Sequence, residues 1–229
     1  MLISDPSSTG IERVENMDMA YISFGDPALP SLHYKYFVGR NILKHELYDV
    51  AVLTIKNPDD KLPRALYLQN QSNQVMEHVH LIGYGHINQP DKHIDLKCEV
   101  VHPNSVLLSE QYVMQNETVF KKDLMSHGKD PNLVDEYYCG FNEEHRLLLH
   151  TSMEHGASGA PIINITGKGR QLAVVGVFIG AIPKFFFKLS KEKQRCFPDE
   201  HRIEYGARMD YIYKELNKFD SSLAAEVFG

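Results

Sequence analysis

The segment of this sequence best suited to chemistry is a serine in a glycine-rich turn, HGASGAP, which runs from His155 to Pro161. Glycines on both sides of Ser158 let the main chain turn tightly. Such a turn exposes the hydroxyl and lets main-chain N–H groups converge where the oxygen of a reacting carbonyl would become negative. These are the requirements of acyl transfer with a serine nucleophile. A glycine-rich hairpin turn without chemistry is the alternative interpretation.

The residues after this turn separate two kinds of serine hydrolase. In the α/β-hydrolases the serine lies in G-x-S-x-G between a strand and a helix. Here the order is G-A-S-G-A-P, and the apolar run from Pro161 to Ile165 predicts a strand after the serine. The sequence therefore excludes the α/β-hydrolase turn.

A carboxylate begins a second informative segment, YDVAVLTI, which runs from Tyr48 to Ile55. Asp49 stands at the start of a run too apolar to be an exposed strand. An acid in such a place must be satisfied by hydrogen bonds, and orienting an imidazole is one such use. An aspartate that only caps the strand is the commoner alternative.

Two other groups of residues suggest different chemistry. His78 and His80 share one face of a predicted strand and His86 follows closely, as in some zinc sites. No carboxylate or cysteine completes that set, so we expect no metal and no cofactor. Residues 184 to 193, KFFFKLSKEK, mix bases with aromatic rings, which suits nucleic acid, but we expect a solvated loop.

Composition limits the class of protein. Apolar residues make up 43% of the 229 residues and charged residues 24%, which predicts a folded chain. Thirty acidic residues outnumber 24 basic ones, so binding to nucleic acid is not expected. The longest apolar stretch is too short to cross a membrane, and the first residues do not form a secretory signal. We expect an intracellular protein, cytoplasmic or nuclear.

Short apolar runs of strand length recur through the chain and predict a mostly β protein. They are Ala20 to Phe24, Tyr34 to Val38, Val50 to Ile55, Val79 to Gly83, Leu147 to Leu149, Pro161 to Ile165 and Leu172 to Ile179. Helical spacing is clear only at Ile212, Leu216 and Phe219, after Asp210 as N-cap. The polar segment 110–142 predicts long surface loops.

Taken together, the YDVAVLTI and GASGAP segments resemble the trypsin/chymotrypsin-like serine peptidases of the PA clan. Leu81 to Gly85, LIGYG, is similar to an early strand of that family's second barrel, and Tyr205 to Met209 to the strand before its last helix. The resemblance implies an all-β fold of two antiparallel barrels, the first incomplete. Residues 1–56 would form the partial first barrel, 57–76 a linker, 77–208 the second barrel and 209–220 a C-terminal helix.

The resemblance also implies roles for single residues. Ser158 would be the nucleophile, Asp49 would orient the histidine, and the N–H groups of Gly156 and Ser158 would form the oxyanion hole. Substrate contacts would come from Ser152 at the base of the S1 pocket, His155 on its rim, and Val174, Val175, Gly176 and Val177 along its wall. The uncharged base favours an apolar or aromatic residue at P1. The implied function is that of a serine endopeptidase acting on proteins or peptides.

Departures from the family pattern indicate which members of the family this sequence resembles more. Ala157 stands where secreted members have the aspartate used in activation, and the three cysteines form no CxxC pair. The pattern is closer to intracellular members, such as the HtrA-type proteases and the group called "family with sequence similarity 111".

The family's catalytic histidine has no counterpart in this sequence. His33 and His45 lie too close to Asp49 in the chain, and we expect the histidine upstream of Met1. A protease-like domain that binds peptides or partners without cleaving them is therefore the alternative function. The oligomeric state stays open.

Overall fold

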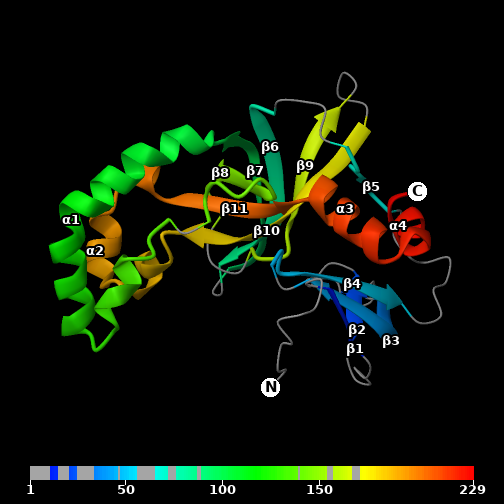
Figure 1. Cartoon of the computed structure of the whole chain (residues 1–229), viewed down its shortest axis with the longest axis horizontal. Coiled ribbons are helices and arrows are strands. Elements are labelled where there is room, and N and C mark those ends of the chain that lie inside the picture. The colour runs from blue at the N-terminus through cyan, green and yellow to red at the C-terminus, as the bar shows by residue number, and fades with distance from the viewer. Residues whose placement is uncertain are drawn as a thin grey trace. The chain divides into compact units, whose positions relative to one another are not determined.

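The chain forms two compact units (Figure 1). The first contains residues 1–67, 215–227 and 229, and the second contains residues 68–214 and 228. The computed structural model describes residues 11–14, 21–24, 34–45, 47–55, 65–71, 76–86, 89–138, 140–153, 157–166 and 171–229.

An antiparallel sheet forms most of the described part of the first unit that precedes residue 56. The long strand β3 lies at its centre and pairs with the other three. Its first half pairs with β2, and its second half lies between β1 and β4. The strands are β1 (Ile11–Val14), β2 (Tyr21–Phe24), β3 (Tyr34–His45) and β4 (Val50–Ile55). The strands predicted in this part of the chain are confirmed.

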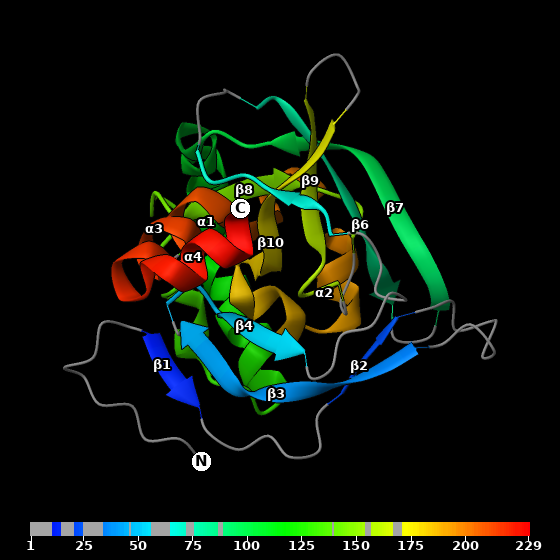
Figure 2. The same cartoon turned by 90° about the vertical axis from the view of Figure 1, so that its right-hand side faces the viewer.

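The second unit contains a closed antiparallel barrel (Figure 2). Each strand pairs with its neighbours in the order β11-β8-β7-β6-β9-β10, and β11 also pairs with β10, which closes the ring among the described residues. Its strands are β6 (His78–His86), β7 (Gln89–Val100), β8 (Arg146–His150), β9 (Pro161–Thr166), β10 (Gln171–Ile182) and β11 (Ile203–Arg208), with the short β5 (Tyr67–Leu68) beside β10. A β fold with a chymotrypsin-type barrel, as the sequence predicts, is confirmed.

Side chains from strands β6 to β10 and from the segment before β9 fill the barrel. Most are small or branched apolar residues, which suits a narrow β-barrel. The cluster comprises Val79, Leu81, Cys98, Leu147, Leu149, Met153, Ala157, Ala160, Ile162, Val175 and Phe178. Ala157 and Ala160 flank the serine turn, so the barrel core anchors that turn on both sides.

A long helix lies where the sequence predicted surface loops. Helix α1 (Val106–Ser126) covers much of segment 110–142, so that prediction was wrong for these residues. Val113, Phe120 and Leu124 are buried along one face of α1. The remaining face is polar except for scattered exposed apolar residues, which hid the helical period in the sequence.

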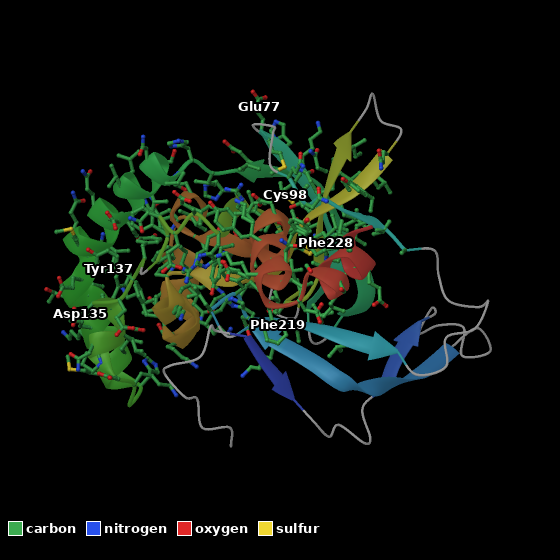
Figure 3. The ribbon with its side chains drawn as sticks, turned by 45° about the vertical axis from the view of Figure 1, so that its right-hand side comes forward. Glu77, Cys98, Asp135, Tyr137, Phe219 and Phe228 are labelled. Atoms are coloured by element: carbon green, nitrogen blue, oxygen red, sulfur yellow. The ribbon has the colours of Figure 1, made fainter. Side chains whose placement is uncertain are left out.

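Helix α1 packs on a second apolar core at one end of the barrel. Phe120, Phe185 and Phe197 meet there, with ring centroids 5.3 to 6.4 Å apart. Asp135 and Tyr137 lie beside α1 (Figure 3), and Lys121 contacts Asp135 at 2.6 Å. The connecting elements are η2 (Pro103–Ser105), η3 (Pro131–Val134), η4 (Lys184–Lys188), α2 (Lys191–Cys196) and η5 (Asp199–His201).

The basic and aromatic segment 184–193 is part of this second core. Phe185 and Phe186 are buried at 0% and 6% exposure, so their rings are not free to stack on bases. The prediction of a solvated loop was therefore wrong for Phe185 and Phe186, while Phe187 is exposed. Of the segment's four lysines, Lys184, Lys188 and Lys191 are exposed and Lys193 is half-buried.

Two helices, rather than the one predicted, end the chain. Helix α3 (Met209–Phe219) begins one residue before the predicted cap, because the Asp210 carboxylate pairs with Arg208 instead. Helix α4 (Ser221–Phe228) follows, and its N-cap Asp220 accepts the N–H of Leu223 at 2.9 Å. No helix in the described ranges is both long and apolar enough to span a membrane.

Candidate active site

Ser158 lies in a tight turn that leads into β9. The N–H of Ala160 donates to the carbonyl of Ala157 at 2.9 Å and closes the turn. Gly159 has φ +90°, a conformation that L side chains rarely adopt, although a Cβ there would meet nothing within 4 Å. Glycine is thus required by the backbone rather than by space. Ala157 and Ala160 are buried, while Ser158 is exposed.

The serine turn is joined to strand β10. The N–H of Gly159 donates to the carbonyl of Phe178 at 2.8 Å, and the N–H of Phe178 donates to the carbonyl of Ala160 at 2.9 Å. The hydroxyl of Ser158 donates to the carbonyl of Ile179 at 2.8 Å. Three hydrogen bonds therefore hold the nucleophile candidate beside residues 178 and 179.

The predicted wall of the substrate pocket lies just before this contact. Val174 and Val175 are 5% and 4% exposed, and β10 pairs here with β9 through Val174↔Ile163 and Gly176↔Ile162. Val177 is half-buried. These residues form barrel wall, while the part of β10 that touches the serine turn is Phe178–Ile179. The substrate role of Val174 to Val177 stays a prediction.

Ser152 contacts two residues that the sequence analysis missed, His93 and Asp95. Its N–H and its hydroxyl both donate to Asp95 Oδ2, at 2.7 and 3.0 Å. The ring Nε2 of His93 lies 3.0 Å from Ser152 Oγ. His93 and Asp95 are two apart on β7 and so share one face, the signal that could have found them. Ser152 and Asp95 border a cavity of about 710 Å³.

Asp95 is ionised at neutral pH in spite of partial burial. Burial alone would raise its pKa, but hydrogen bonds from the main chain of Ser152, the hydroxyl of Thr151 and the main chain of Lys97 outweigh that effect. They lower the pKa of Asp95 to about 2. A carboxylate therefore lies against the residue predicted for the base of the S1 pocket.

Asp49 lies in the first unit, in the turn between β3 and β4. Its side chain is exposed and its φ is +50°. The described side chains of β4 are exposed or half-buried, so the expected burial of this strand is not found. Ser158 belongs to the second unit, and its proximity to Asp49 stays a prediction.

The remaining histidine candidates have simpler roles or lie outside the described residues. The ring of His45 stacks on Tyr48 at 4.0 Å and accepts the Tyr48 N–H at 3.3 Å, which fixes the β3–β4 turn. His33, His155 and Gly156 lie outside the described residues.

The three histidines of the metal alternative lie on β6. His78 is exposed and His80 is half-buried on β6, while the side chain of His86 is not described. No group of three or more His, Cys, Asp or Glu side chains among the described residues is arranged to hold a metal ion.

Comparison with known proteins supports the peptidase resemblance. No family model matches the chain. The human protein "Serine protease FAM111B" is 27% identical over 192 residues, which cover 79% of this chain. The structure adds a closed antiparallel barrel, in which the serine turn leads into β9. This similarity and the closed barrel are consistent with a trypsin-like peptidase related to the FAM111 group. The chain spans 22% of the length of FAM111B, so the relationship concerns one part of that protein.

Proposed function

We propose that this chain is the peptidase part of a serine endopeptidase, with Ser158 as the nucleophile. The observation that carries the proposal is the exposed Ser158 hydroxyl in a glycine turn anchored to the barrel. The 27% identity to a serine protease supports the same assignment.

The proposed reaction proceeds through an acyl-enzyme. Ser158 Oγ attacks the peptide carbonyl and gives its proton to a histidine base, which Asp49 orients. The Oγ–C bond forms, the C–N bond breaks, and the amine leaves with that proton. Water then hydrolyses the ester and frees the acid. Because the Ser158 proton is now donated to Ile179, this hydrogen bond must be exchanged for one to the base.

An apolar or aromatic P1 residue is the proposed specificity. The segment of β10 beside the serine turn, Phe178 to Ala181, carries no charge. The carboxylate that contacts Ser152, on Asp95, already accepts four hydrogen bonds from its own chain. Peptide substrates that differ only at P1 test the proposal. Substrates with Phe or Leu at P1 should be cleaved fastest. A preference for Arg or Lys at P1 would show that Asp95 contacts the P1 side chain and determines the specificity.

A peptide-binding domain without cleavage is the second candidate. It is favoured by the Ser158 hydrogen bond, because a main-chain carbonyl rather than an imidazole accepts the proton within the described residues. Without a base the neutral hydroxyl is a poor nucleophile. A fluorophosphonate probe followed by mass spectrometry separates the candidates, with Ser158→Ala as the control. Label on Ser158 supports the enzyme, and an unlabelled chain that still binds a peptide without an electrophilic group supports the binding domain.

A further inference from the structure

The carboxylate of Asp95 accepts several hydrogen bonds from the segment that precedes the serine turn. Its Oδ2 accepts the Thr151 hydroxyl at 2.8 Å, the Ser152 N–H at 2.7 Å and the Ser152 hydroxyl at 3.0 Å. Its Oδ1 accepts the N–H of Lys97 at 3.2 Å, which orients the carboxylate on its own strand. Hydrogen bonds to an ionised group are roughly twice as strong as neutral ones.

Thr151 links Asp95 to the apolar core of the barrel. Its hydroxyl donates to Asp95 and accepts the N–H of Met153 at 3.1 Å. Met153 is 2% exposed and belongs to the same apolar cluster as Ala157 and Ala160. A continuous set of contacts therefore runs from Asp95 to the two residues that flank Ser158 and Gly159.

The other side of the serine turn is held by strand β10. Phe178 exchanges main-chain hydrogen bonds with Gly159 and Ala160 at 2.8 and 2.9 Å. Ala157, the residue before the nucleophile, is an apolar residue 2% exposed and offers no carboxylate. The charged group that holds Thr151 and Ser152 therefore comes from β7.

We propose that Asp95 is a positioning residue for Ser158, which it acts on through Thr151 and Met153. The inference rests on the proposed function only for its consequence in catalysis. The anchoring itself can be measured whether or not the chain cleaves peptides.

The experiment compares Asp95→Asn and Thr151→Val with two controls in the full chain. Thr151→Ser keeps the hydroxyl and should restore the parent behaviour. Asp123→Asn is the matched control, because Asp123 accepts the N–H and the hydroxyl of Ser190 at 2.8 Å each, the same donors that Ser152 offers Asp95. Thermal unfolding curves identify a temperature at which every variant is folded, and the measurements are made at that temperature. If Asp95→Asn does not fold, Thr151→Val alone tests the proposal.

The first readout is amide hydrogen exchange at Gly159 and Ala160, whose N–H groups are hydrogen-bonded in the turn. Asp95→Asn and Thr151→Val should each exchange about tenfold faster there, the expected effect of losing one charged hydrogen bond. Thr151→Ser and Asp123→Asn should match the parent. Unchanged exchange in Asp95→Asn or Thr151→Val, or equal acceleration in Asp123→Asn, would overturn the proposal.

The second readout is the rate at which a fluorophosphonate labels Ser158. Asp95→Asn should lower the maximal labelling rate by about tenfold with little change in probe affinity, because position rather than binding is altered. A parent chain that is never labelled contradicts the proposed function but leaves the exchange result decisive. A change in exchange without a change in the labelling rate of an active chain would also overturn the positioning role.

Discussion

The hydroxyl of Ser158 donates a 2.8 Å hydrogen bond to the main-chain carbonyl of Ile179. The proton that a base must remove during acyl transfer is therefore held by strand β10. A neutral hydrogen bond of this kind contributes only about 1 kcal/mol, so a nearby imidazole can replace the carbonyl at small cost. This contact also fixes the direction in which the nucleophile points at rest.

Removal of the Ser158 hydroxyl should scarcely affect folding. Because the side chain is exposed and makes one neutral hydrogen bond, Ser158→Ala should lower the free energy of unfolding by about 1 kcal/mol or less. Urea denaturation followed by circular dichroism measures the change. A loss above about 3 kcal/mol would show that the hydroxyl is a structural element of the turn.

A methyl group added at Gly206 should destabilise the barrel. A Cβ there would lie 2.6 Å from the carbonyl oxygen of Val177 and would overlap Ile162. Gly206→Ala should therefore cost about 2 to 4 kcal/mol of stability, as overpacking against a strand does. Gly180→Ala is the control, since its Cβ would meet only Tyr205 at 3.9 Å or beyond. Equal stability of the two variants in urea would contradict this close approach of β10 and β11.

The serine turn should depend on glycine at residue 159. Gly159 has φ +90°, so Gly159→Ala should cost about 1 to 2 kcal/mol through backbone strain alone, because its Cβ has free space. The same variant should also label more slowly, because the strained turn moves Ser158. Ala160→Gly, which leaves φ at 159 unchanged, is the comparison for both measurements. Full stability and full labelling of Gly159→Ala would contradict the turn geometry.

Glu204 should make stability depend on pH. Burial raises its pKa from 4.5 to about 7, against the opposing effects of Arg202 and of hydrogen bonds to Thr151 and its own main chain. Between these two values the folded state binds more protons than the unfolded state, so stability falls as pH rises through the window. The loss is complete above pH 7 and amounts to at most about 3 kcal/mol.

Glu204→Gln removes the titrating carboxyl group. The difference in stability between variant and parent then measures the contribution of Glu204 alone. The variant and the parent should be about equally stable at pH 4, and the variant should be more stable at pH 8. Burial also lowers the pKa of His145 and His201, but those effects are common to both proteins and cancel in the difference. Urea denaturation at both pH values provides the measurement. If the stability of the parent increased relative to that of the variant as pH rises, the raised pKa of Glu204 would be contradicted.

The strands and the serine turn could be predicted because they leave local signals. Alternating or continuous runs of Val, Ile and Leu mark strands such as β4 and β9 directly. The glycines around Ser158 mark a turn, and its exposed hydroxyl follows from the same local geometry.

Features that depend on distant contacts could not be predicted. Helix α1 is stabilised by aromatic residues such as Phe185 and Phe197, far away in the sequence, while its own surface is mostly polar. The role of Asp95 arises only when β7 and the segment after β8 come together in the barrel. Asp220 looks like an ordinary charged residue until the break between α3 and α4 makes it a cap.

Labelling of Ser158 by a fluorophosphonate tests the central claim most directly. The experiment uses this chain together with the natural sequence that surrounds it, and mass spectrometry identifies the modified residue. We predict one label, on Ser158, absent in Ser158→Ala and formed at least about a hundredfold more slowly in Asp49→Asn. A folded protein that takes no label, or takes it equally well without Ser158, would contradict the account.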